Sequence, residues 1–196
     1  RGQVFFEGRR FTRMPSYRRA QLGLARSYQI TSVFTHLTVS QNLSLAIQAH
    51  HGHSFRFWKK AVDDPVIRRL VVPAMARVDL EARANIPAAN LSHGEKRQLE
   101  VGMALAGHPK MLLLDEPYAG MGPGGAVELT KLIKRLKTEV TILLVEHDMG
   151  AVFSLADRIT VLVYGQAIAS GTPDEIRANP QVREAYLGDE ANGCSK

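Results

Sequence analysis

Two acidic residues follow a strongly apolar run in the second half of the 196-residue sequence. Residues 111–114, Met-Leu-Leu-Leu, predict a buried strand, and Asp115 and Glu116 come directly after it. Parallel sheets place ligand sites at the carboxyl ends of their strands. One carboxylate there can hold Mg²⁺, and a second can orient water against a phosphoryl group. The pair therefore predicts phosphoryl chemistry, with the alternative that both acids only cap the following turn.

A second candidate is the segment Ser92, His93, Gly94 and Glu95, which opens a predicted helix that ends near Ala106. Free amides at a helix start, the positive end of the helix dipole and a serine hydroxyl together suit a phosphate, and glycine lets the backbone approach it closely. The alternative is a capping box, because Ser-x-x-Glu before an amphipathic run caps many helices. The two interpretations are compatible.

Two single residues complete the candidates. Gln29 follows a predicted strand over residues 24–28, and His147 follows another over residues 140–145. Taken alone, such a glutamine is more often a solvated loop residue, and a lone histidine is usually structural. Their order along the chain, with the other two motifs between them, is the order expected if all four lie along one nucleotide site.

The elements that must position these residues alternate between strands and helices. Strands made almost wholly of Leu, Ile and Val predict a parallel sheet covered on both faces by helices, one of them over residues 126–137. Residues 158–169 predict a hairpin that turns near Tyr164-Gly165, and Thr172 opens a terminal helix with a capping box. The fold class is therefore α/β.

Residues 31–90 have a different texture, with apolar residues recurring at helical spacing. We therefore expect an α/β core built from residues 1–29 and 91–196. The expected insertion is an α-helical subdomain over residues 30–90, which includes the loop that follows Gln29.

Composition limits the classes of function. The formal charge of +6 permits an anionic partner, but the basic residues are scattered and lack interleaved aromatics, so nucleic acid is not expected as a partner. The single cysteine, Cys194, excludes an intramolecular disulfide and fits a reducing compartment. No apolar run approaches the roughly 18 residues that a membrane-spanning helix needs.

At these motifs the sequence resembles the ATP-binding subunits of ABC transporters, over essentially its whole length. LSHGE is similar to the family's LSGGQ signature, MLLLDEP to its Walker B strand, VEHDM to its switch-histidine segment and ARSYQI to its Q-loop. Three longer segments resemble the ATPases of branched-chain amino acid importers in particular: LARSYQITSVFTHLTVSQNL, AGMGP and GTPDEIRANPQVREAYLG.

The resemblance implies a P-loop NTPase fold with a RecA-like sheet, and ATP and Mg²⁺ as ligands. Asp115 and Gln29 would serve the metal, Glu116 would activate the attacking water, and His147 would contact the γ-phosphate. The signature residues would bind nucleotide held by a partner subunit: Ser92 and Gly94, together with His93 and Glu95 of the same motif.

The implied partners follow from those roles. A second ATPase subunit, identical or different, would complete a head-to-tail dimer with two composite sites. Integral membrane permease subunits would dock on residues 30–42 and the helical subdomain, and a solute-binding protein would act indirectly. The implied location is peripheral, on the cytoplasmic face of the inner membrane.

The sequence departs from the family pattern at one major position. The phosphate loop, Gly-x-x-x-x-Gly-Lys-Ser/Thr, is not found in it. We expect an N-terminally truncated chain that lacks this Walker A unit and is inactive in isolation. Two smaller departures are His93, in place of the first signature glycine, and Gly122, where many members have aspartate.

Two alternatives to an importer subunit stay open at this point. One is a soluble ABC ATPase that acts on DNA or ribosomes without a membrane partner. The other is a non-catalytic remnant or regulatory module that lacks the phosphate loop.

Overall fold

The computed structural model of the chain describes residues 2–27, 32–50 and 64–187. The chain forms two compact units, Arg1–Glu146 and His147–Lys196. The elements of the first unit are, in order, β1 (Phe5–Phe6), β2 (Arg9–Arg10), α1 (Ser16–Gln21), β3 (Leu24–Arg26), α2 (Val39–His50), α3 (Pro65–Arg77), η2 (Glu81–Arg83), η3 (Ala88–Asn90), α4 (His93–Leu105), β4 (Met111–Asp115), α5 (Pro123–Leu136) and β5 (Thr141–Val145). Those of the second are α6 (Met149–Leu155), β6 (Ile159–Val163), β7 (Gln166–Gly171), α7 (Pro173–Ala178), α8 (Pro180–Val182) and η4 (Arg183–Leu187). None of these described helices is both long and apolar enough to cross a membrane.

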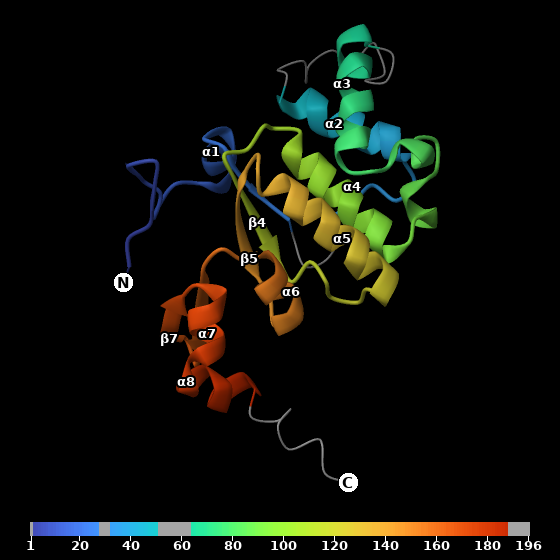
Figure 1. Cartoon of the computed structure of the whole chain (residues 1–196). Helices are drawn as coiled ribbons and strands as arrows, with labels where there is room; N and C mark the ends of the chain where they lie inside the picture. Colours follow the sequence, from blue (N-terminus) through green and yellow to red (C-terminus); the bar gives the residue numbers. More distant parts are fainter. Residues whose placement is uncertain (1, 28–31, 51–63, 188–196) are drawn as a thin grey trace. The chain divides into compact units, whose positions relative to one another are not determined.

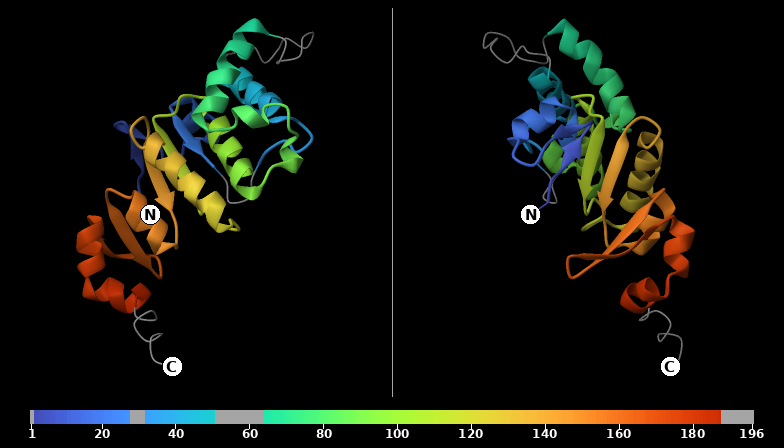
Figure 2. Two further views of the ribbon diagram at one scale, coloured as in Figure 1. Left: turned by 45° about the vertical axis from the view of Figure 1, so that its right-hand side comes forward. Right: turned by 90° about the vertical axis from the view of Figure 1, so that its left-hand side faces the viewer.

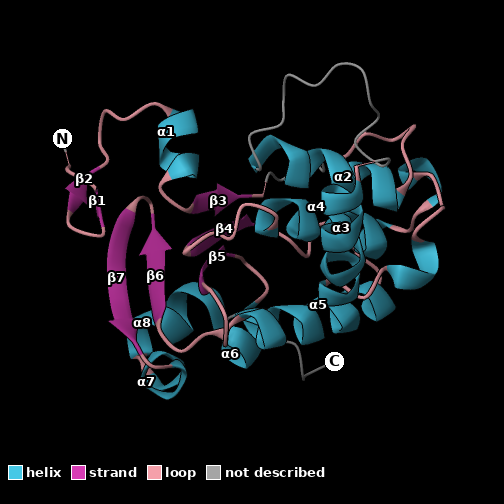
Figure 3. Cartoon of the chain, turned by 90° about the horizontal axis from the view of Figure 1, so that it is seen from above, coloured by secondary structure: helices cyan, strands magenta, loops and turns pink. Residues whose placement is uncertain are grey.

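A three-stranded parallel sheet in the order β3-β4-β5 is the centre of the first unit (Figure 3). The central strand β4 places Asp115 opposite Val145 of β5, and it places Leu113 opposite Arg26 of β3. The predicted parallel sheet and the predicted α/β class are therefore confirmed. The predicted division into residues 1–29 with 91–196 and residues 30–90 stays a prediction.

One face of this sheet is covered by α4 and α5, which lie along β4 and β5 (Figure 2). Alternate residues of β4, Leu112 and Leu114, point to this face and are fully buried. The two helices present buried apolar side chains at helical spacing, namely Leu99, Leu105, Leu129, Leu132, Ile133 and Leu136. Burial of each such side chain contributes roughly 1.5–3 kcal/mol, so this layer is the main hydrophobic core of the unit.

The opposite face of β5 is open among the described residues. Leu143 and Val145 are 50% and 54% exposed, and Thr141 is exposed on the same side of the strand. The prediction that helices cover both faces is therefore wrong for this strand. The reason is that the described helices beside β5, α4 and α5, both lie on the face of Leu112 and Leu114.

Helix α5 begins at Pro123, three residues before its predicted start at Ala126. Pro123 occupies the first helical turn, where its missing N–H is not needed. The glycines that follow it, Gly124 and Gly125, lie in the helix. Tertiary contact outweighs their low helix propensity here, since Gly125 packs against α4.

The helices predicted between residues 31 and 90 are confirmed as α2 and α3, which pack on each other and on α4 (Figure 1). Asn42 of α2 is fully buried and holds the segment before the helix. Its amide nitrogen donates to the carbonyls of Phe34, Leu37 and Thr38, and its Oδ1 accepts from the Phe34 amide at 2.9 Å. Asn42 therefore supplies hydrogen-bond partners to backbone groups just before and at the start of α2.

The second unit contains the predicted hairpin. Strands β6 and β7 pair antiparallel and turn at Tyr164 and Gly165, whose φ values of +48° and +77° suit a tight hairpin turn. The predicted capping box at Thr172 is also confirmed, with both of its hydrogen bonds present. The unit has a small core of its own, which consists of Ile159, Val161, Ile176 and Val182.

Candidate functional site

The acidic pair lies at the carboxyl end of β4. The Glu116 amide donates to the Val145 carbonyl at 2.9 Å, so the ladder with β5 continues one residue past Asp115. Glu116 itself has a φ of +44°, which is the left-handed region. A non-glycine residue is uncommon there, and such strain persists only where the surrounding structure imposes it. Four other described non-glycine residues share a positive φ, namely Glu7, Asp79, His108 and Tyr164, so it is the place of Glu116 at the carboxyl end of a parallel strand that favours a functional interpretation.

Asp115 has an ion-pair partner that the sequence did not reveal. The Nη2 atom of Arg26 lies 3.0 Å from Asp115 Oδ2, and the two side chains are 53% and 35% exposed. The pair forms because both residues lie at the carboxyl ends of neighbouring parallel strands. An exposed pair of this kind contributes less than about 1 kcal/mol to stability.

The fit of a metal to this position follows from its donor set. No group of three or more His, Cys, Asp or Glu side chains gathers within residues 2–27, 32–50 and 64–187. Magnesium bound with a phosphate substrate needs only one or two carboxylates, because waters and phosphate oxygens supply its other ligands. A single aspartate, Asp115, is therefore a sufficient protein ligand for that ion.

The loop after Glu116 is held by side chains from two other elements. The Tyr118 amide donates to Glu146 Oε1 at 3.0 Å, and the Tyr118 hydroxyl lies 2.8 Å from Thr130 Oγ1 on α5. Within the loop, the Ala119 amide donates to the Glu116 carbonyl at 3.1 Å. The backbone around Glu116 is thus fixed by contacts from β5, from the residue after it and from α5.

The start of α4 is a complete capping box. Ser92 Oγ accepts from the Glu95 amide at 3.2 Å, and Glu95 Oε2 accepts from the Ser92 amide at 2.8 Å. The other oxygen, Oε1, accepts from Arg83 Nε at 2.6 Å. Partial burial alone raises the pKa of Glu95, but the hydrogen bonds from Ser92 and Arg83 outweigh it, so the pKa lies below its usual value. The capping interpretation of this motif is confirmed.

The same motif still presents a helix start that a phosphate can approach. Ser92 and His93 are exposed, and Gly94 is half-buried. The glycine is also needed for packing, because a Cβ at Gly94 would lie 3.1 Å from the Cα of Gly125 on α5. Real Cβ atoms rarely lie this close to a backbone atom. The helices α4 and α5 therefore approach each other at two glycines, Gly94 and Gly125.

The candidate residues fall into three groups in the structure. Strand β4 runs downward in Figure 1 and α4 and α5 run back upward, so Asp115, Glu116 and the Ser92 motif lie at the same end of the first unit. His147 is exposed and opens the second unit, next to Asp148, which caps α6 by accepting from the Ala151 amide. Gln29 lies outside the described residues.

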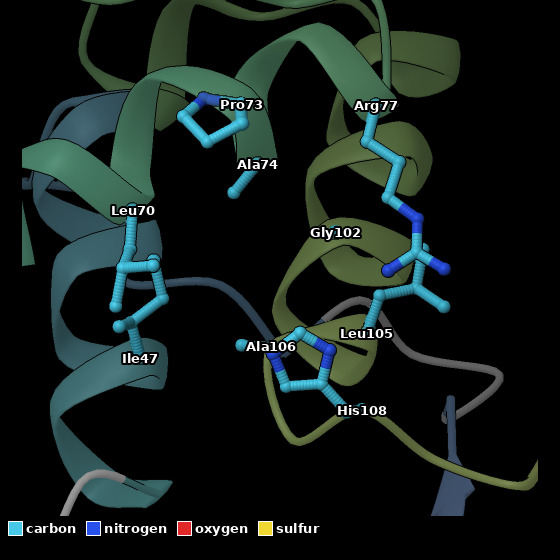
Figure 4. A pocket seen from close by; sticks show the side chains of 9 residues that line it. All are labelled: Ile47, Leu70, Pro73, Ala74, Arg77, Gly102, Leu105, Ala106 and His108. Carbon is cyan, nitrogen blue, oxygen red and sulfur yellow. The ribbon is translucent and has the colours of Figure 1, made fainter.

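A cavity of about 150 Å³ lies elsewhere in the first unit, between α2, α3 and α4 (Figure 4). None of the candidate residues lines it. Its walls are mostly apolar, with Arg77 and His108 at its edge, and consist of Ile47, Leu70, Pro73, Ala74, Arg77, Gly102, Leu105, Ala106 and His108. The residues that line this cavity come from the helices and do not include the acidic pair.

Comparison with known proteins matches this arrangement to one family. The model of the family described as ABC transporter matches residues 1–119, and that of the branched-chain amino acid ATP-binding cassette transporter matches residues 168–192. The chain is 36% identical to the high-affinity branched-chain amino acid transport ATP-binding protein LivG of Salmonella typhimurium, covering 96% of this chain and 76% of LivG. The corresponding protein BraF of Pseudomonas aeruginosa is also 36% identical, with the same coverage.

The solved structures agree with the sequence comparison. The ADP conformation of MJ1267, an ATP-binding cassette of an ABC transporter, superposes with a TM-score of 0.78 at 27% identity, covering 96% of this chain and 77% of that one. The fold is therefore that of the P-loop NTPase cassettes, as the sequence predicts. On the family match over residues 1–119 and the 36% identity to LivG, the chain belongs to the ATP-binding proteins of the ABC transporter family.

Proposed function

We propose that the protein is the ATP-hydrolysing subunit of an importer for branched-chain amino acids. The proposal is supported by the names of its relatives, LivG and BraF, and by the family match over its C-terminal segment. The single observation that carries the catalytic part is the position of Glu116 directly after Asp115, at the carboxyl end of the parallel strand β4.

In this proposal each residue has a distinct task. Asp115 would hold Mg²⁺, which would supply positive charge to the phosphates, and Gln29 would serve the same metal. Glu116 orients the attacking water and takes its proton, while His147 contacts the γ-phosphate. A general base of this kind contributes about 10²- to 10⁴-fold to a rate.

The start of α4 serves a nucleotide bound to a second ATPase subunit. Exposed Ser92 and His93, the amide of Gly94 and the positive end of the α4 dipole form the contact surface. Glu95 supports that surface by holding Ser92 in the capping box. The expected assembly is a head-to-tail dimer on integral membrane permease subunits, at the cytoplasmic face of the inner membrane, served by a solute-binding protein.

Substitution of Glu116 by glutamine in the protein tests the catalytic assignment. We expect ATP hydrolysis to fall by about 10² to 10⁴, because glutamine keeps the size of the side chain but cannot take a proton. ATP binding, measured by equilibrium titration, should persist. Glu128→Gln makes the same change at an exposed position on α5 and is the control. Normal turnover by Glu116→Gln would falsify the assignment.

The transport assignment needs a separate measurement. We expect the protein to co-purify with permease subunits of a branched-chain amino acid importer from the same organism. In the reconstituted assembly, a branched-chain amino acid should stimulate ATP hydrolysis. Stimulation by an unrelated solute alone contradicts the proposed substrate class and leaves the role of Glu116 unaffected.

A further inference from the structure

Tyr118 links the loop after Glu116 to two separate elements of the first unit. Its amide donates to Glu146 Oε1 at 3.0 Å, just past the end of β5, and its hydroxyl lies 2.8 Å from Thr130 Oγ1. Both contacts join residues far apart in the sequence. Glu146 is half-buried and directly precedes His147.

The direction of the second hydrogen bond follows from the number of protons available. Thr130 Oγ1 carries one proton, which it donates to the Ala126 carbonyl at 2.8 Å. The Tyr118 hydroxyl must therefore be the donor to Thr130 Oγ1. Tyr118 donates twice, once from its amide and once from its side chain, and so it is fixed at both ends.

These two hydrogen bonds lie two residues after Glu116, whose backbone is in the left-handed region. The left-handed conformation of Glu116 costs roughly 1–2 kcal/mol per residue in general. Its amide is fixed to the Val145 carbonyl on one side, but on the other side the chain continues into an exposed loop at Ala119 and Gly120. Tyr118 attaches that loop to Glu146, just past the end of β5, and to Thr130 of α5.

We propose that Glu146 and Tyr118 are positioning residues for Glu116. Through the Tyr118 amide, the Glu146 carboxylate holds the backbone two residues beyond Glu116, and this fixes the direction of the Glu116 carboxylate toward the attacking water. The inference rests on the proposed function, in which Glu116 is the general base. Neither Glu146 nor Tyr118 belongs to the residues predicted from the sequence motifs.

Amide hydrogen exchange tests the contact directly and does not depend on activity. In Glu146→Ala the Tyr118 amide should exchange about ten- to a hundredfold faster, as expected when a bond to a charged acceptor is lost. Glu146→Gln keeps an oxygen acceptor and should restore most of the protection. Glu128→Ala removes a carboxylate from an exposed ion pair on α5 and should leave Tyr118 unchanged.

ATP hydrolysis by the protein then tests the consequence. Glu146→Ala should lower kcat by roughly 10- to 100-fold with KM for ATP changed less than about twofold, because a displaced base slows the chemical step and leaves nucleotide binding intact. Tyr118→Phe keeps the amide and loses only the hydroxyl, so its kcat should fall less. Glu146→Gln should recover most of the rate.

The two proposals fail in different ways. Unchanged Tyr118 exchange in Glu146→Ala, or a loss of rate that appears only in KM, overturns the positioning role alone. Full turnover by Glu116→Gln overturns the proposed function, and with it the catalytic part of this inference. A loss of kcat in Glu146→Ala that Glu146→Gln does not rescue also counts against positioning through the Tyr118 amide.

Discussion

The start of α4 and the end of β4 carry the two motifs of the first unit, and their local energetics are opposite. At the start of α4, Ser92 and Glu95 satisfy each other within four residues, and the backbone of Ser92 is ordinary, with a φ of −62° and a ψ of 165°. At the end of β4, Glu116 has a φ of +44°, its amide donates to the Val145 carbonyl of β5, and the nearby Tyr118 amide donates to Glu146, far along the chain.

The difference shows how a motif can serve folding or work against it. The α4 motif stabilises its own helix, since a serine cap contributes about 1 kcal/mol, and so its presence is explained even without a ligand. The β4 motif costs free energy at Glu116, a cost that the chain also carries at Glu7, Asp79, His108 and Tyr164. A capping role explains the α4 motif but not Glu116, so the position of Glu116 directly after Asp115 is the stronger indication of chemistry for this chain.

The largest expected change in stability tests whether the α4 motif depends only on its own residues, as its capping box suggests, or also on α5. Gly94→Ala places a Cβ 3.1 Å from the Cα of Gly125, so α4 and α5 must move apart. We expect the free energy of unfolding to fall by about 2 kcal/mol, the usual cost of overpacking. Urea denaturation with an unchanged m-value is the measurement.

A matched control lies one residue from the contact. A Cβ at Gly124 meets nothing within 4 Å, and Gly124→Ala should stabilise α5 by about 0.5 kcal/mol. Equal effects of Gly94→Ala and Gly124→Ala would mean that the crossing of the two helices does not constrain the α4 motif.

A second prediction concerns the strain at Glu116. Glu116→Ala and Glu116→Gly both remove the carboxylate, but only glycine adopts a positive φ without a steric penalty. Because the left-handed conformation costs other residues roughly 1–2 kcal/mol, and glycine loses more backbone entropy, Glu116→Gly should be more stable than Glu116→Ala by about 1 kcal/mol. Equal midpoints of thermal unfolding for the two variants would show that Glu116 is not strained in solution.

The features that could be predicted from the sequence are those with local causes. The apolar run of β4 and the Ser-x-x-Glu box of α4 depend on neighbouring residues, and both were located correctly. The start of α5 was missed because Gly125 is explained only by its contact with Gly94. The open face of β5 was missed because strand composition cannot show which helices lie on a sheet.

The residues of the candidate site also differ in whether neighbouring residues or distant contacts explain them. Asp115 and Glu116 were found because they directly follow an apolar strand. Arg26 was not found, since its pairing with Asp115 spans 89 positions and depends on the register of β3 and β4. Glu146 was not found either, because it lies 28 positions from Tyr118 and nothing near it in the sequence indicates an amide partner.

The smallest expected effect is the pH dependence of the α4 motif. The pKa of Glu95 is lowered in the folded state, so the unfolded chain binds its proton more readily, and stability must rise with pH between the two pKa values. The contribution is fully present above the unfolded pKa of about 4.3 and is lost as the pH falls through the lower folded value.

Glu95→Gln keeps a capping side chain but removes the charge at the helix start, which contributes about 0.3–1 kcal/mol. Wild type should therefore exceed Glu95→Gln in stability by that amount above about pH 5, and the two should converge in stronger acid, as measured by urea midpoints across the pH range. Glu128→Gln controls for the change in net charge, and a difference between wild type and Glu95→Gln that does not vary with pH would mean that the Ser92 and Arg83 bonds do not favour the ionised carboxylate.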